Sequence, residues 1–372
     1  MPACTAVLGV ASSYERLNAN NVSKTLCMLG DNSGNLLFTE ALMRILNETV
    51  LVTKHDIISG HSKLNDYGAI VIAAANWLNE YEDFGWLSKE LEQTEVPVYL
   101  IGVGIQADIG AALPTLPLGT VRMLSIISER SALISTRGIF SSEILEKLGI
   151  MNSVPTGCPS LLLAGSKRPI LRKASNLDVV MHGTRHGFLC GDKLQNALYR
   201  AAFEKKYQLI LQSETADIEC IAAGLGTRIP EESMQMLRLV YNSKNDLSIA
   251  EYLSEFASFH TNIHSWMNHL KSVSFCIGSR FHATIAAIIA GTPALLITHD
   301  KRTLELADTM GIPHVFGSMI DDSHLLNIDV MIEAFNSSSF LDNFVEYREN
   351  FEHFFSKNQL DTRKNPALLG DF

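Results

Sequence analysis

Apolar and polar positions alternate along the chain in blocks that predict strands and helices in turn. In the first half, apolar runs predict strands at residues 25–29, 50–53, 69–75, 98–103 and 133–136. Between and after them, apolar residues at helical spacing predict helices at about 36–46, 87–93 and 141–148. The residues before 25 are expected to be disordered. Alternating strands and helices are typical of a parallel sheet covered by helices on both faces.

The same alternation starts again after a turn-rich segment at residues 165–169, which suits a link between domains. Strands of this second series are predicted at 177–181, 208–212, 273–277 and 294–298. We therefore expect an α/β protein with two Rossmann-like, doubly wound domains that face a cleft. The first covers residues 1–165 and the second 166–328. The helical segment 329–372 is expected to pack back on the first domain.

Composition narrows the class of partner. Of the 372 residues, 47% are hydrophobic and 19% are charged, as in globular proteins with large cores. The net charge of −10 argues against nucleic acid as a partner, because phosphate contacts need clustered Lys and Arg. An anionic ligand must therefore be held by a few local cations.

Cysteine usage and the absence of targeting signals indicate a cytoplasmic protein. The six cysteines include no CxxC pair, which favours reduced core thiols and argues against a metal site. No basic segment precedes an apolar core at the N-terminus, so no signal peptide is expected. The most apolar stretch, 283–298, is interrupted and too short to span a bilayer, although the protein could still contact the inner face of a membrane.

The most informative stretch is 275–283, where Arg280 and His282 occupy the turn between an apolar strand and an apolar helix. A strand that feeds a helix in this way brings the helix amides and positive dipole end to one point, which favours a phosphate or carboxylate. Arg280 adds a fixed charge, and His282 adds a group that titrates near neutral pH. The alternative is a buried arginine paired with a core carboxylate beside a structural histidine.

Other strand-end loops carry weaker signals. The loop at 29–35 has short polar residues and two glycines, which suit either close approach to a ligand or an ordinary turn. The segment 102–104 resembles half of a dinucleotide fingerprint but lacks its third glycine, so NAD is weakly supported. Arg137 lies at a strand end just before a helix, where its charge opposes the helix dipole unless an anion or an acidic residue compensates.

Two histidine- or lysine-bearing loops leave alternatives open. His182 and His186 have a spacing that suits a metal on a helix, but the glycines around them indicate a loop. The basic pair Lys301 and Arg302 precedes a predicted helix and is either solvated surface or a phosphate clamp.

Four segments in a fixed order carry a resemblance to a known family. They are Gly30-Asp31-Asn32-Ser33-Gly34-Asn35, Ser135-Thr136-Arg137-Gly138-Ile139-Phe140-Ser141, Ser279-Arg280-Phe281-His282-Ala283, and Lys301 followed by the 304–311 helix. Together they resemble the polysaccharide pyruvyl transferase family over most of residues 25–315. The resemblance implies a GT-B-like pair of Rossmann domains. It also implies transfer of the pyruvyl skeleton of phosphoenolpyruvate to two hydroxyls of a sugar, with a cyclic ketal and free phosphate as products and no metal or organic cofactor.

The resemblance also implies roles for individual residues. The donor's phosphate and carboxylate need Arg forks, so Arg137 and Arg280 are expected to bind them, with Ser279 as a further contact and Lys301 as an auxiliary phosphate contact. His282 is expected to be the general acid that protonates the donor's methylene carbon. The first domain would hold the acceptor, which is a glycan or a lipid-linked or nucleotide-linked sugar. Its expected contacts are Asp31, Asn32, Asn35, Asn76 and Trp77.

The chain departs from the family pattern in three places. Ala73-Ala74-Ala75-Asn76-Trp77 stands where the family often has glycines, and Cys158-Pro159 stands where it often has Asp-Pro. Asn32-Ser33-Gly34-Asn35 stands where the family has an early Asn-x-Gly-Asp. Two other functions are compatible with the same architecture. One is a GT-B glycosyltransferase that uses a nucleotide sugar, with Glu214 or Asp217 placed to hold the ribose. The other is a non-catalytic protein that binds a carbohydrate or an anion.

Overall fold

The first half of the chain forms a parallel sheet in a flavodoxin-like order. The computed structural model describes residues 4–363 except 109, 111, 113, 186–191 and 336–337. Four strands pair in the order β2-β1-β3-β4, namely β1 (Thr5–Leu8), β2 (Thr49–Val52), β3 (Ala69–Ala73) and β4 (Val98–Ile101). A further parallel pair continues this sheet, because Val103 bridges to Thr136; it consists of β5 (Ile134–Thr136) and β6 (Ser153–Pro155).

Three helices of the first half lie where the pattern predicts them, namely α2 (Asn35–Ile45), α4 (Gly85–Glu92) and α6 (Ile139–Lys147). Three others were not predicted, namely α1 (Val22–Met28), α3 (Lys54–Ile58) and α5 (Leu118–Arg130). The strand predicted at 25–29 is wrong: this segment lies in α1, and the first strand is β1, within residues expected to be disordered. Val22, Thr25 and Leu26 are buried at helical spacing, but a short apolar run does not reveal its period in sequence.

The second sheet has six parallel strands in the Rossmann order β12-β11-β10-β7-β8-β9. They are β7 (Val179–His182), β8 (Gln208–Leu211), β9 (Ala257–Phe259), β10 (Phe275–Gly278), β11 (Ala294–Thr298) and β12 (His314–Phe316). Its helices are α7 (Lys193–Lys205), α8 (Thr215–Ala223), α9 (Glu231–Tyr241), α10 (Asp246–Phe256), α11 (Ile263–Ser272), α12 (Phe281–Ile289) and α13 (Lys301–Met310). The expected α/β class is confirmed.

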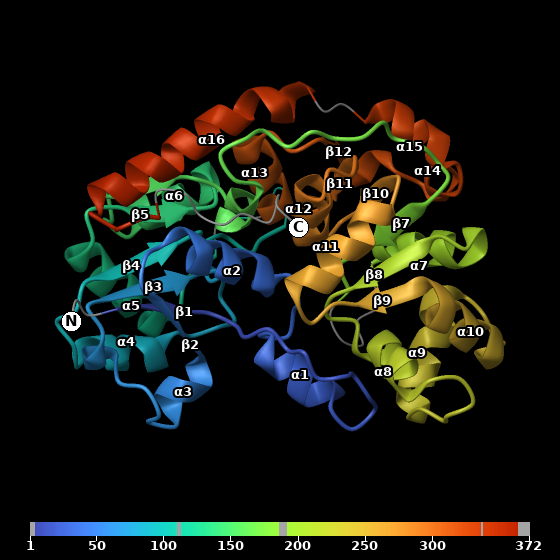
Figure 1. The fold of residues 1–372 in the computed structure, drawn as a ribbon, viewed down its shortest axis with the longest axis horizontal. Helices are drawn as coiled ribbons and strands as arrows, with labels where there is room; N and C mark the ends of the chain where they lie inside the picture. Colours follow the sequence, from blue (N-terminus) through green and yellow to red (C-terminus); the bar gives the residue numbers. More distant parts are fainter. Residues whose placement is uncertain are drawn as a thin grey trace.

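Segments from each end of the chain lie on the other half. Val22 and Leu26 of α1 belong to the apolar core of the second sheet. After α14 (Asp322–Leu326) and α15 (Ile328–Ala334), the long helix α16 (Ser338–Lys357) runs past α6 and β5 (Figure 1). Just beyond α16, Asn358 bonds to the backbone of Ala132 and Leu133. The domain boundaries at 165 and 328 stay a prediction.

The strand orders fix where a ligand can approach. In each sheet the chain leaves the first strand, β1 or β7, towards one side and later returns to its other side, which opens a crevice at the carboxyl ends. His182 ends β7 and Gly278 ends β10, so residues 182–185 and 279–282 follow adjacent strands. In the described part of the chain, none of the helices is both long and apolar enough to cross a membrane.

Candidate active site

A small cavity lies where the carboxyl ends of the two sheets meet. It measures about 40 Å³ and is lined by Asn32, Asn35, Ala75, Asn76, Arg137, Thr184, Gln212, Arg280, Phe281, His282, Arg302 and Leu306. Three guanidinium-bearing side chains and one imidazole, from the segments after β5, β10 and β11, therefore face the same space. The structure brings together Arg137, Arg280 and His282, as the sequence predicts.

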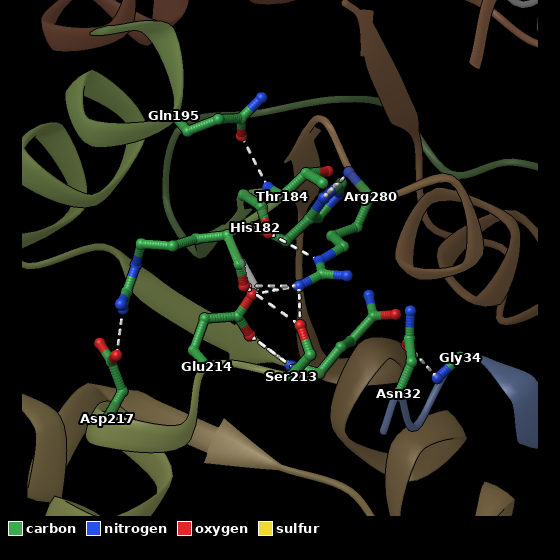
Figure 2. A network of polar contacts seen from close by, with 12 residues as sticks. Asn32, Gly34, His182, Thr184, Gln195, Ser213, Glu214, Asp217 and Arg280 are labelled. Carbon is green, nitrogen blue, oxygen red and sulfur yellow. Dashed lines mark hydrogen bonds and ion pairs between the residues drawn. The ribbon is translucent and has the colours of Figure 1, made fainter. Parts of the chain in front are cut away.

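Arg280 is held by the loops after β7 and β8. Its Nε donates to the carbonyl of Gly183 (2.8 Å), and its Nη2 reaches the carbonyl of Arg185 (3.0 Å). Nη2 also bonds to the hydroxyl of Ser213 and forms an ion pair with Glu214, as Figure 2 shows. The buried ion pair that the sequence left as an alternative is thus present, yet Arg280 still lines the cavity.

Glu214 and Asp217 are both fully buried and ion-paired. Burial would raise the pKa of Glu214, but the charges of Arg280 and Arg185 hold it at about 2. Asp217 forms an ion pair with Arg185 and accepts a hydrogen bond from Tyr241 (2.5 Å; Figure 2 shows Asp217). The glycosyltransferase alternative needs one of these carboxylates to hold a nucleotide ribose. Both are already engaged in buried ion pairs, so neither is available for that role.

Ser279 is part of the scaffold behind Arg280. The side chain is completely buried, and its hydroxyl donates to Gln195 (2.6 Å) and accepts from the backbone N–H of Thr184 (2.8 Å). Because these bonds join the loops after β7 and β10 to α7, Ser279 fixes the turn that carries Arg280. It does not line the cavity, so a direct contact between its side chain and the donor is not supported.

Arg137 is a buried cation that has no carboxylate within 4 Å in the described part of the chain. Its Nε donates to the carbonyl of Gly102 (2.9 Å), and its Nη1 donates to Oδ1 of Asn76 (2.5 Å). Burial lowers the pKa of Arg137 and the charge of Arg302 lowers it further, although Cys158 and Glu305 oppose this shift. Gly104 is required here, because a β carbon would overlap the aliphatic stem of Arg137. Gly104 thus makes room for this arginine, while Gly102 contributes the carbonyl that accepts from its Nε.

His282 lies between the two halves of the site. Its Nε2 is 3.5 Å from Sγ of Cys158, and its ring is 5.4 Å from that of Phe38 on α2. Burial, together with the charges of Arg137, Arg302 and Arg280, lowers the pKa of His282 well below its ordinary value. Gly34 permits this approach, since a β carbon there would lie 2.9 Å from Nδ1. The lowered pKa of His282 favours the neutral imidazole.

Arg302, not Lys301, reaches the cavity from the start of α13. The ammonium of Lys301 lies 5.9 Å from the centre of the Phe140 ring, and Lys301 is not part of the lining. Arg302 lines the cavity and bonds to Asp300 (3.1 Å), which caps α13 together with Thr303. The expected phosphate contact from Lys301 is therefore not supported, and the member of the basic pair that lines the cavity is Arg302. Gln212, at the end of β8, was also missed.

A larger cavity of about 350 Å³ opens next to the small one, at the crevice of the first sheet. Asn32, Asn35, Ala75 and Asn76 line both cavities. All five residues expected to bind the acceptor line the larger one, namely Asp31, Asn32, Asn35, Asn76 and Trp77. Aromatic rings supply much of its wall: Trp77 stacks on Phe84 with centroids 4.1 Å apart, and Trp86 carries the ammonium of Lys54 over its ring.

Two remaining sequence signals have structural explanations or lie beyond the described residues. His182 is buried, and its Nδ1 accepts the backbone N–H of Arg280 (3.0 Å), which orients the arginine. Burial lowers the pKa of His182 to about 3. His186 lies outside the described residues. Ser141, which ends the second segment of the family resemblance, donates its hydroxyl to Glu305 of α13 (2.7 Å).

Comparisons with known proteins agree with this arrangement. A model of the family described as polysaccharide pyruvyl transferase matches residues 32–301. Among solved structures, MnaA of S. aureus with UDP is similar over 100% of both chains, with 10% identity and a TM-score of 0.51. A putative UDP-N-acetylglucosamine 2-epimerase from Listeria monocytogenes aligns over 96% of this chain and 95% of its own, with 9% identity and a TM-score of 0.42. The fold is that of GT-B glycosyltransferases and epimerases. Curated sequences give no significant match.

Proposed function

The chain belongs to the polysaccharide pyruvyl transferase family, and we propose that it transfers a pyruvyl group from phosphoenolpyruvate to two hydroxyls of one sugar. The products are a cyclic ketal and phosphate. The observation that carries the proposal is the buried guanidinium of Arg137. It lines the small cavity with Arg280 and Arg302 and has no carboxylate within 4 Å in the described part of the chain. A buried charge without a carboxylate in contact is costly, and an anionic donor would supply that contact.

The donor chemistry fits the groups around the cavity. His282 would give a proton to the methylene carbon, which leaves C2 electrophilic, and one sugar hydroxyl would then bond to C2 and lose its own proton. In the resulting tetrahedral adduct, the bond between C2 and the bridging phosphate oxygen breaks, and phosphate leaves with the proton of the first hydroxyl. The second hydroxyl then bonds to C2, gives its proton back to His282 and closes the ring. Bound negative charge would raise the pKa of His282, so donor binding itself prepares the acid.

The larger cavity suits a sugar acceptor. Sugars stack their C–H faces on aromatic rings while their hydroxyls bond to carboxylates and amides, and this cavity offers both kinds of group. Because Asn32, Asn35 and Asn76 line both cavities, a sugar in the larger one would present its hydroxyls towards the donor. The linked group of the acceptor, a glycan, lipid or nucleotide, would extend into solvent.

The proposal is tested by mixing the protein with phosphoenolpyruvate and a panel of simple glycosides, nucleotide-linked sugars and lipid-linked sugars. We expect phosphate release that depends on one class of acceptor, and a product whose mass equals acceptor plus the pyruvyl ketal. Release of a nucleoside diphosphate from a nucleotide sugar would instead favour a glycosyltransferase. Donor binding without any product would favour a non-catalytic anion-binding protein.

Trp77 gives a prediction for the acceptor side. Trp77→Ala should raise the KM for the acceptor by about threefold to tenfold, because an aromatic stacking contact contributes roughly 0.5–1.5 kcal/mol. The KM for phosphoenolpyruvate should change by less than twofold. Steady-state kinetics with each substrate varied in turn would measure both. Tyr81→Ala is the matched control, because Tyr81 is exposed and is not part of the cavity lining. An unchanged acceptor KM in Trp77→Ala would contradict the acceptor assignment.

A further inference from the structure

We infer that Arg302 and Gln212 bind the phosphate group of the donor and, after transfer, the free phosphate product. This inference rests on the proposed function for the identity of the donor, but the site itself can be tested with phosphate alone. It assigns ligand contacts to two residues from different strand ends, the loop after β11 and the end of β8, that face one cavity.

Gln212 presents a buried donor group without a partner. The residue is 1% exposed and lines the cavity, and among the described residues nothing accepts a hydrogen bond from its Nε2. Its backbone is fixed on both sides: the N–H donates to Glu214 (2.7 Å), and the carbonyl accepts from Ser33 (3.1 Å). A buried amide donor left unsatisfied costs roughly 1–3 kcal/mol, so a ligand oxygen in the cavity is the simplest explanation.

Arg302 presents a second buried hydrogen-bond donor. Its Nη2 bonds to Asp300, but within the described part of the chain its Nε has no hydrogen-bond partner. The side chain is held in place because Asp300 is itself fixed by a capping box with Thr303 at the start of α13. Arg302 also lies near enough to His282 and Arg137 for its charge to lower their pKa values. The positive charge of Arg302 therefore reaches the same small space.

The chemistry of the pair favours phosphate over carboxylate. Arg137 and Arg280 each donate hydrogen bonds to several protein oxygens. In contrast, Nε of Arg302 and Nε2 of Gln212 are buried and have no hydrogen-bond acceptor among the described residues. Phosphate offers more acceptor oxygens and more charge than a carboxylate, and the cavity wall includes Phe281 and His282 at the N-terminus of α12. The donor's carboxylate is then left to the Arg137 side of the cavity.

The test uses inorganic phosphate and pyruvate as separate probes of the two anionic groups. Binding of each would be measured by calorimetry, without donor or acceptor, for the wild type, Arg302→Gln and Gln212→Met. We expect the Kd for phosphate to rise tenfold or more in both variants, since each loses a hydrogen bond to a charged group. The Kd for pyruvate should change by less than twofold. Arg122→Gln, which removes an exposed cation on α5, is the control for net charge and should bind phosphate normally.

Gln212→Met separates a binding role from a structural one. Methionine has a similar shape and removes an unsatisfied donor, so the free energy of unfolding should stay equal or rise while phosphate binding weakens. Unchanged phosphate binding in both variants, or a loss of pyruvate binding in place of phosphate binding, would overturn the inference. Phosphate binding that depends on this pair in a protein that forms no ketal would leave the inference standing and contradict the proposed function. If the protein forms the ketal but both variants bind phosphate normally, the proposed function stands and this inference is wrong.

Discussion

Replacing His282 with Gln is expected to lower kcat by about 10²–10⁴-fold, the range typical for loss of a general acid, while phosphoenolpyruvate still binds. The imidazole lines the donor cavity and contacts Cys158, Phe38 and Phe281 without an ion pair in the described residues. Glutamine fills a similar volume and keeps hydrogen-bonding capacity, but it cannot deliver a proton. Single-turnover kinetics and donor binding by calorimetry would measure the two effects separately.

The pH dependence provides an independent signature of the same role. In the free protein the pKa of His282 lies well below its ordinary value, so the protonated fraction falls about tenfold per pH unit across the neutral range. If the free protein supplies the proton, kcat/KM should therefore decrease as the pH rises. The pKa seen in kcat should be higher than that seen in kcat/KM, because the bound anion stabilises the imidazolium.

The donor's own phosphate also titrates, so the informative quantity is the ratio of wild type to His282→Gln at each pH. This ratio should fall towards high pH if His282 is the acid. His353→Gln, an exposed position on α16, is the control and should keep the wild-type profile. Turnover of His282→Gln within a few-fold of wild type, with the same pH profile, would exclude the acid role.

Much of the fold could be predicted because the parallel strands are short apolar runs that end in glycine or polar residues. The strands β3, β10 and β11 are buried almost throughout, and every residue except the last of β10 and of β11 is apolar. The strand prediction at residues 25–29 is wrong for the same reason, because it also rests on a short apolar run. An apolar run of five residues is equally compatible with the buried face of a helix, and only its packing against the second sheet's core decides.

The candidate site could be predicted as far as strand ends determine it. Arg137, Arg280 and His282 each follow a strand, and the carboxyl ends of parallel strands converge, so their meeting follows from the topology. The topology does not determine the direction in which a side chain beyond the strand points. Arg302 lines the cavity rather than Lys301 because Asp300 and Thr303 set the start of α13. The partner of Arg280, Glu214, comes from a different βα unit, and no local pattern links the two.

The stability of the site should depend most strongly on Arg280. Arg280→Met is expected to lower the free energy of unfolding by about 3–5 kcal/mol, because Glu214 would remain as a buried charge without its main partner. The carbonyls of Gly183 and Arg185 would also lose a donor. Denaturant unfolding of the wild type and the variant would measure this difference.

A double variant separates this structural role from donor binding. Arg280→Met with Glu214→Gln should recover part of the lost stability, since no buried charge is left, but it should not recover binding of phosphoenolpyruvate. The pH dependence of stability has a definite sign. The pKa of Glu214 is about 2 in the folded protein against an ordinary 4.5, so the wild-type pair contributes fully above about pH 4.5 and loses its contribution as the pH falls towards 2. The double variant should lack this acid-dependent loss. Recovery of donor binding together with stability would mean that Arg280 serves only the scaffold, and that Arg137 and Arg302 hold the anion without it.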